Sequence, residues 1–155
     1  MKRAYLETVA LVERLHRHFL EVVKNEIDRM GVRDINNVQA LILYNIGADE
    51  MTVGELTQRG YYLGSNVSYN LKKLIDCGYI AQARSQHDRR SVRIKLTDKG
   101  IVLHRKLDAI FEHHAREIEG TLPIADLADA SEALRRLERF WDDARAGLLA
   151  NSAAA

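Results

Sequence analysis

The stretch from Met51 to Gly100 limits the folds open to this chain of 155 residues more than any other part of it. It begins with two short segments whose apolar residues recur at helical spacing, MTVGELTQRG and SNVSYNLKKLIDCG. Two β-prone runs follow, YIAQARS and SVRIKL, which are joined by the polar residues QHDRR, and the stretch ends in a helix start, TDKG. This order predicts two consecutive helices, a two-stranded hairpin and a further helix.

The second of these helices, which begins near Ser65, carries the first candidate binding surface. One side of it is apolar and is expected to pack inward through Val67, Leu71, Leu74 and Ile75. The other side is polar and basic, and it carries Ser65, Tyr69, Lys72, Lys73 and Asp76, with Asn66 and Ser68 on its flanks. Such side chains can contact base edges and phosphates, so this side suits a DNA major groove. An ordinary solvated helix surface would explain the same residues nearly as well in isolation.

The tip of the predicted hairpin favours the DNA interpretation. It holds His87, Asp88, Arg89 and Arg90. A guanidinium group on a thin β-ribbon can enter the narrow minor groove, where negative potential is concentrated. Asp88 would repel phosphate, so we expect it to orient an arginine or to cap the turn.

Positive charge is confined to the same part of the chain. The formal net charge is −1 over residues 1–51, +5 over residues 52–96 and −3 over residues 97–155. A near-neutral protein with one basic face is what phosphate binding through a single surface requires. Chance clustering of solvated charges is the simpler alternative.

A long helix is predicted before this stretch. Apolar residues recur at helical spacing from Ala4 to about Met30, and Gly31 is a suitable end. A helix of this length measures about 40 Å, more than the width of a small domain. A partner subunit is therefore the simplest way to bury its apolar face.

The next helix, NNVQALILYNIG, is apolar almost all round and is expected in the core. Asp34 or Asn36 can cap it, and Gly47 ends it. A short connection over residues 48–51 should lead to Thr52 and Glu55, whose spacing is that of a capping box at the start of the following helix.

Two helices are predicted after the hairpin. Thr97 caps the first, which ends at Gly120 and has an apolar stripe made by Leu103, Leu107, Ile110, Phe111, His114 and Ile118. Pro123 fits the first turn of the last helix. Apolar residues of that helix repeat at steps of three and four, the spacing of a seam for another helix: Leu127, Ala130, Leu134, Leu137, Trp141, Ala144 and Leu148.

Composition excludes several classes of protein. Apolar residues make up 46% and charged residues 29%, as in soluble globular proteins, and the runs VALV and ALILY are too short to span a bilayer. Glu7 and Glu13 interrupt any signal-peptide core, so the cytoplasm is the expected compartment. Cys77 has no second cysteine to pair with, and at the C-terminal end of its helix it is expected to be an unreactive thiol.

The six histidines do not form a convincing metal site. His113 and His114 are adjacent, and adjacent helical positions point about 100° apart. His16 and His114 lie on apolar stripes, where they can be core residues or line a ligand cavity. No metal or other cofactor is expected, and the absence of nucleophile triads, Gly-rich phosphate loops and CxxC motifs argues against an enzyme.

The segment DRRSVRIKLTDKG resembles the wing of the MarR family of bacterial transcription regulators. Asp88, Arg90, Leu96, Thr97 and Gly100 match the family pattern D-x-R-x-x-x-x-x-L-T-x-x-G. ELTQRG, NVSYNLKKL and CGYI resemble the helix-turn-helix of the family and its exit into the wing. The order of the predicted helices extends this resemblance to nearly the whole chain.

The resemblance implies a mainly α (α+β) fold, a winged helix-turn-helix with long terminal dimerisation helices. It implies one domain over residues 1–155, with dimerisation helices at 1–31 and 101–149 and the DNA-binding part at 36–100. Two recognition helices would enter successive major grooves of a pseudo-palindromic operator. Two departures from the family pattern concern DNA binding: Tyr69 stands where Arg is frequent, and RGYYLGS replaces a turn of small residues.

The sequence thus predicts a homodimeric, sequence-specific regulator of transcription, a ligand-responsive repressor. Phosphate contacts are predicted for Lys72, Lys73, Arg84, Arg89 and Arg93, and base or groove contacts for Ser65, Asn66, Ser68, Tyr69 and Arg90. By the resemblance, a small apolar effector would contact His16, Phe19, Leu20, Leu43 and Tyr44, which are otherwise plain helix and core residues. The alternative is a winged-helix module that docks a protein through the same basic face without specific DNA binding.

Overall fold

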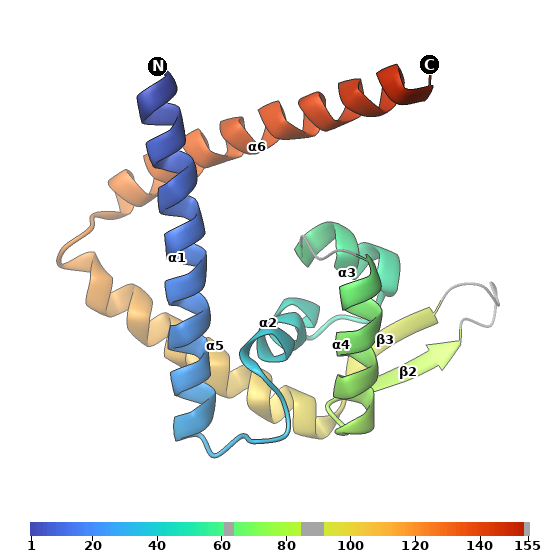
Figure 1. Cartoon of the computed structure of the whole chain (residues 1–155). Helices are drawn as coiled ribbons and strands as arrows, with labels where there is room; N and C mark the ends of the chain where they lie inside the picture. Colours follow the sequence, from blue (N-terminus) through green and yellow to red (C-terminus); the bar gives the residue numbers. More distant parts are fainter. Residues whose placement is uncertain (61–63, 85–91, 154–155) are drawn as a thin grey trace. The chain divides into compact units, whose positions relative to one another are not determined.

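The computed structural model in Figure 1 describes residues 1–60, 64–84 and 92–153, and for residues 60, 64, 65, 84 and 148–153 it describes the backbone alone. The elements are α1 (Lys2–Arg29), α2 (Asn37–Ile46), β1 (Met51–Thr52), α3 (Val53–Gly60), α4 (Gly64–Asp76), β2 (Ile80–Arg84), β3 (Val92–Leu96), α5 (Asp98–Glu119) and α6 (Ile124–Ala153). The chain divides into two compact units, Met1–Ile110 and Phe111–Ala155, with the boundary inside α5.

Local signals at both ends of the first loop act as predicted. Gly31 ends α1 with a φ of 74°, and its N–H donates to the carbonyl oxygen of Asp28. Asn36 caps α2, and its side chain and that of Gln39 form both hydrogen bonds of a capping box. Asn36, rather than Asp34, is therefore the cap.

The core of the first unit lies between α2, α3, α4 and one face of the sheet. Its completely buried side chains include Ile42, Leu43, Leu56, Val67 and Leu74, which come from α2, α3 and α4. Val23 and Ile27 are also buried, so the C-terminal end of α1 belongs to this core. Burial of this kind contributes about 1.5–3 kcal/mol for each large aliphatic side chain, and it holds both α3 and α4 against α2.

The sheet has three strands, so the predicted two-stranded hairpin was incomplete. Its order is β1–β3–β2, and both pairs are antiparallel. Ile94 in the central strand β3 lies opposite Met51 of β1 on one side and opposite Gln82 of β2 on the other. Met51 is 2% exposed, which shows that β1 closes the core. A strand of two residues is too short to show the alternation by which strands are recognised, so the sequence predicts only a connection over residues 48–51.

Both capping signals around the sheet are present. The N–H of Thr52 donates to the carboxylate of Glu55 at 2.6 Å, and the N–H of Glu55 donates to Oγ1 of Thr52 at 3.2 Å. Thr97 contacts both neighbouring elements. Its N–H donates to the carbonyl oxygen of Tyr79, and its hydroxyl donates to the carbonyl oxygen of Gly78. The same hydroxyl accepts a hydrogen bond from the N–H of Gly100. The Leu-Thr-x-x-Gly part of the wing pattern therefore joins the start of β2 to the start of α5.

Gly100 is required by this junction. A Cβ atom at residue 100 would lie closer to the carbonyl oxygen of Tyr79 than real Cβ atoms approach, and also 3.2 Å from Cβ of Leu96. Because the nearest atom is backbone, it cannot move aside without shifting β2. The glycine of the pattern is thus explained by close packing of a helix on a strand.

A polar cluster ties the loop before α2 to the same junction. Asp34 accepts hydrogen bonds from the hydroxyl of Tyr79 and from Nζ of Lys99, both at 2.8 Å, and Nζ of Lys99 lies 4.0 Å from the centre of the Tyr79 ring. Partial burial works against ionisation of Asp34, but the hydrogen bonds from Lys99 and Tyr79 outweigh it and lower the pKa of this carboxyl below its ordinary value. The cluster links the loop before α2, the segment between α4 and β2, and the first turn of α5 through charge-assisted hydrogen bonds.

The second unit comprises the end of α5, a tight turn and α6. The N–H groups of Thr121 and Leu122 both donate to the carbonyl oxygen of Ile118, and that of Leu127 donates to the carbonyl oxygen of Pro123. Several large apolar side chains of this unit are exposed: Ile118, Ile124, Leu127, Leu134, Phe140 and Trp141.

Replacing Gly100 by Ala should destabilise the protein by about 2–3 kcal/mol, the usual cost of forcing a methyl group into a packed contact. Urea unfolding followed by circular dichroism measures the loss. Gly120→Ala is the matched control, because a Cβ there has no neighbour within 4 Å. It should change the free energy of unfolding by less than about 0.5 kcal/mol. Equal stability of the two variants would contradict the proposed role of Gly100.

Candidate nucleic-acid interface

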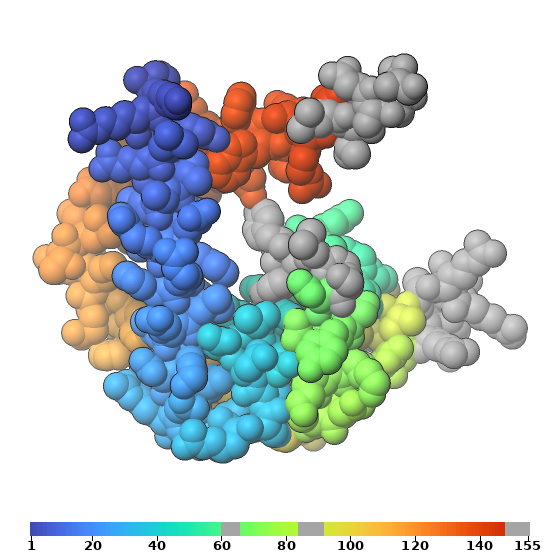
Figure 2. All heavy atoms as spheres, in the orientation of Figure 1, coloured from blue at the N-terminus to red at the C-terminus, as the bar shows by residue number. Residues whose placement is uncertain are grey.

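One face of α4 is presented to solvent as the sequence predicts. Val67, Leu71 and Leu74 are buried beneath the helix, while Tyr69 is 70% exposed. Asn66, Ser68, Lys72 and Lys73 are also exposed, and Figure 2 shows the atoms of α4, in green, at the surface of the first unit. A helix held by a buried apolar stripe and showing a polar, basic face can enter a major groove.

Part of the predicted interface lies outside the described residues. Asp88, Arg89 and Arg90 at the hairpin tip belong to this part, and so does the turn over residues 61–63. For Ser65 in α4 and Arg84 in β2 the backbone is described but the side chain is not. Their contacts with DNA stay predictions.

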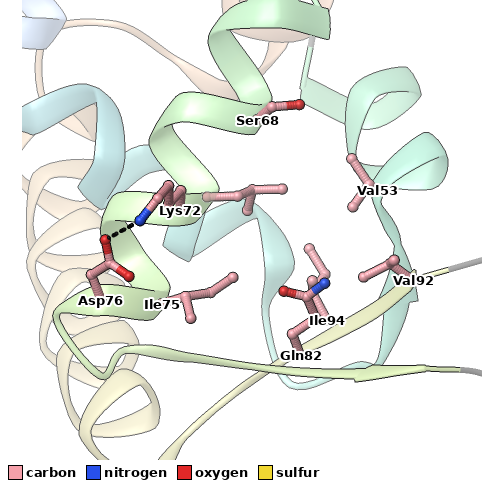
Figure 3. A pocket seen from close by; sticks show the side chains of 9 residues that line it. Val53, Ser68, Lys72, Ile75, Asp76, Gln82, Val92 and Ile94 are labelled. Atoms are coloured by element: carbon pink, nitrogen blue, oxygen red, sulfur yellow. Dashed lines mark hydrogen bonds and ion pairs between the residues drawn. The ribbon is translucent and has the colours of Figure 1, made fainter.

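A depression of about 360 Å³ lies between α4 and the sheet. In Figure 3 the side chains of Ser68, Lys72, Ile75 and Asp76 project from α4, and those of Gln82, Val92 and Ile94 project from the strands. Val53, at the start of α3, lies on the far side of the depression from Lys72. α4 and the base of the hairpin thus form one continuous, partly apolar surface.

Lys72 has an intramolecular partner on this surface. Its Nζ donates to Oδ2 of Asp76 at 2.8 Å, one helical turn away, and this hydrogen bond raises the pKa of the lysine above its ordinary value. Both side chains are more than half exposed, so the pair is weak and phosphate can replace the carboxylate.

Arg93 is also paired. Its Nε donates to Oε1 of Glu50 at 2.8 Å, and its Nη2 donates to the backbone carbonyl oxygen of Glu50 at 3.2 Å. Because Arg93 lies in β3 and Glu50 directly precedes β1, this double contact holds the edge strand to the sheet. This partner could not be predicted from the sequence, because 43 residues separate the two side chains.

Lys73 differs from both, since no ion pair involving it occurs within residues 1–60, 64–84 and 92–153. It is exposed on the same helix as Tyr69 and Asn66. Its full positive charge is therefore available to a phosphate group.

The residues predicted for an effector are in unlike environments. Leu43 is completely buried in the core, while His16 is exposed and Phe19 is partly exposed. Tyr44 donates from its hydroxyl to Asp108 at 2.9 Å, and its ring stacks on that of His104 with centroids 5.0 Å apart. The fifth residue, Leu20, is half-buried, and its carbonyl oxygen accepts a hydrogen bond from Asn37. The effector role of these residues stays a prediction.

Within the described part of the chain, no group of three or more His, Cys, Asp or Glu side chains is placed to hold a metal ion. In the same part, no helix is both long and apolar enough to cross a membrane.

Comparison with known proteins identifies the central segment. Residues 35–100 match the family model described as a winged helix DNA-binding domain. The chain is 41% identical over 145 residues to the exopolysaccharide II synthesis transcriptional activator ExpG of Rhizobium meliloti, and the match covers 90% of this chain and 73% of ExpG.

Solved structures share the fold. FabT of Streptococcus pneumoniae, solved in complex with DNA, aligns with this chain with a TM-score of 0.69 at 24% identity, over 90% of this chain and 98% of FabT. A mutant of MarR from E. coli complexed with operator DNA aligns with a TM-score of 0.72 at 18% identity over 86% of this chain and 95% of MarR. The mainly helical winged-helix fold predicted from the sequence is confirmed.

Lys73→Ala should lower the slope of log affinity for duplex DNA against log salt concentration by about 0.9, the value for one lost phosphate contact. Arg93→Ala should lower it less, because Glu50 already compensates that charge, and should lower the melting temperature instead. Affinities at several salt concentrations, measured by fluorescence anisotropy, give the slopes. Lys106→Ala, which removes an exposed lysine of α5, is the control and should leave the slope unchanged. Equal slope changes for Lys73→Ala and Lys106→Ala would refute the assignment.

Proposed function

Since the chain belongs to the MarR family of winged helix-turn-helix transcription regulators, we propose that it acts as a homodimer on a pseudo-palindromic operator. As a transcription regulator with a winged-helix DNA-binding domain it is not an enzyme, in agreement with the sequence analysis. The observation that carries the proposal is the exposed polar, basic face of α4, held on a buried stripe beside the base of the hairpin.

The exposed apolar residues at both ends of the chain support a homodimer. On α1, Leu11, Leu15 and Phe19 are each more than 40% exposed, and α6 exposes Leu134, Phe140 and Trp141. Exposed large apolar side chains that recur on one side of a helix, as Leu11, Leu15 and Phe19 do on α1, are typical of subunit interfaces. Two subunits joined in this way would present two copies of α4 at a set spacing, which is what two half-sites of an operator require.

We expect repression, through occupation of an operator that overlaps a promoter, and release by a small apolar effector. ExpG is a transcriptional activator, so the sign of regulation needs a test of its own. A reporter gene fused to the operator with its native promoter distinguishes the two signs by the direction in which expression changes when the protein is present.

The test of the proposed function starts from genomic fragments selected by the purified full-length protein. The selected duplex should bind with an affinity that falls steeply as salt rises, while its preference over a shuffled duplex is retained. Arg90→Ala should weaken binding to the selected duplex by about 1–3 kcal/mol with the fold intact. Binding without sequence preference would favour the alternative, a winged-helix module that docks a protein.

Leu15→Asp should dissociate the homodimer, because it places a charge within the exposed apolar face of α1. Sedimentation velocity measures the mass. Deletion of the whole helix is a poorer test, because it would remove Val23 and Ile27 from the core. Ala10→Asp is the matched control: it adds the same charge to the same helix, about 140° around the axis from Leu15. A dimer that persists in Leu15→Asp would contradict the proposed interface.

A further inference from the structure

Gln39 is the one polar side chain that is buried among the residues with described burial, at 3% exposure. Its amide oxygen accepts from the N–H of Asn36 at 3.0 Å, within the capping box of α2. Its amide nitrogen donates to Oδ1 of Asn70 in α4 at 3.1 Å. A single side chain thus connects the first turn of α2 to the recognition helix, 31 residues further along the chain.

The second amide continues this connection inside α4. Nδ2 of Asn70 donates to the carbonyl oxygen of Asn66 at 2.8 Å, one turn earlier in the helix. Asn66 is exposed on the face predicted to contact DNA. The path from the cap of α2 to the DNA-facing side of α4 therefore consists of three hydrogen bonds, Asn36 to Gln39, Gln39 to Asn70, and Asn70 to Asn66.

The hydrogen bonds admit only one orientation of the two amides. If the Asn70 amide were reversed, its nitrogen would face the nitrogen of Gln39 and its oxygen would face the carbonyl oxygen of Asn66. If the Gln39 amide were reversed, its nitrogen would face the N–H of Asn36. The network therefore fixes one direction for each hydrogen bond and has no equivalent alternative arrangement. Apolar contacts do not provide this directionality.

Asn70 lies where its hydrogen bond to Gln39 can resist rotation of α4 about the helix axis. Val67, Leu71 and Leu74 form the centre of the buried stripe, and Asn70 lies at its edge, about 40° around the axis from Asn66. A helix resting on an apolar stripe can roll with little change in buried area, whereas a directional bond at the edge of the stripe breaks when it rolls. With a radius of about 5–6 Å, a roll of about 15° moves side-chain tips by about 1.5 Å, which is enough to break a hydrogen bond to a base.

We propose that the Gln39–Asn70 amide pair is a positioning device that sets the roll of the recognition helix and so determines how well this protein discriminates between DNA sequences. The inference rests on the proposed function, because it assumes that α4 reads base edges. Gln39 is buried, and the side-chain amide of Asn70 is engaged with Gln39 and with the carbonyl oxygen of Asn66. Their contribution is to hold Asn66 and Tyr69 in one orientation, so they affect base contacts and leave phosphate contacts largely unchanged.

The experiment compares affinities of full-length variants for the selected operator duplex and for a shuffled duplex of the same composition. Asn70→Ala should reduce the ratio of the two affinities about tenfold, the loss expected for one displaced base contact. Its salt slope should stay that of the unmodified protein, because no phosphate contact is removed. Lys73→Ala is the contrasting control: it should lower both affinities and the salt slope, with little change in the ratio.

The double variant Gln39→Met with Asn70→Leu separates positioning from stability. Replacing both partners by apolar side chains of similar size leaves neither amide unsatisfied. Only the part-buried N–H of Asn36 loses its acceptor, so the melting temperature should be higher than that of Asn70→Ala, in which the buried amide nitrogen of Gln39 has no acceptor. The ratio of affinities should nevertheless stay reduced about tenfold.

If the double variant recovered both the ratio of affinities and the melting temperature, the role of the amide pair would be purely structural and the inference would be overturned. An unchanged ratio in Asn70→Ala would overturn it as well. If the unmodified protein itself binds both duplexes equally, the proposed function fails. If it discriminates and the variants discriminate equally well, only the positioning role fails.

Discussion

The contact between the backbone of Tyr79 and Gly100 is the constraint on which the rest of the first unit depends. It brings the first turn of α5 against the start of β2, and Thr97 closes the junction with hydrogen bonds to Gly78, Tyr79 and Gly100. Because Lys99 and Tyr79 also hold Asp34, the same point anchors the loop that leads into α2. Within the first unit, the loop before α2, the start of β2 and the first turn of α5 are therefore joined at one point.

The basic face of the DNA-binding part is not uniformly charged. Lys72 and Arg93 are each paired with a carboxylate, while Lys73 forms no ion pair in the described part of the chain. Paired cations exchange a protein carboxylate for a phosphate on binding and so add less to non-specific affinity. Under the proposed function, this arrangement would leave more of the total affinity to base contacts, on which the choice of a site depends.

The buried amides and the exposed face of α4 show two ways of holding a helix. Apolar residues such as Val67 and Leu74 supply most of the stabilisation, but they resist rolling of the helix weakly, since area burial has no direction. The Gln39–Asn70 bond adds little net stability and supplies direction. A protein that reads base edges needs both, because a hydrogen bond to a base tolerates only a small displacement of its donor.

Local signals in the sequence were enough to determine most of the elements. Gly31, Asn36, Thr52 and Thr97 begin or end helices as predicted, because caps and positive φ angles act within a few residues. The spacing of Val67, Leu71 and Leu74 likewise determined which side of α4 is exposed, since helical periodicity alone fixes it.

Only the tertiary structure decided the contacts that join distant segments. The strand β1, the partner of Arg93 and the bond between Gln39 and Asn70 all depend on residues that are between 31 and 43 positions apart in sequence. Nothing in a pair such as Gln39 and Asn70 identifies them as partners until α2 and α4 are packed together. The physical reason is that periodicity and capping are properties of a single segment, whereas hydrogen bonds between segments depend on how those segments are placed.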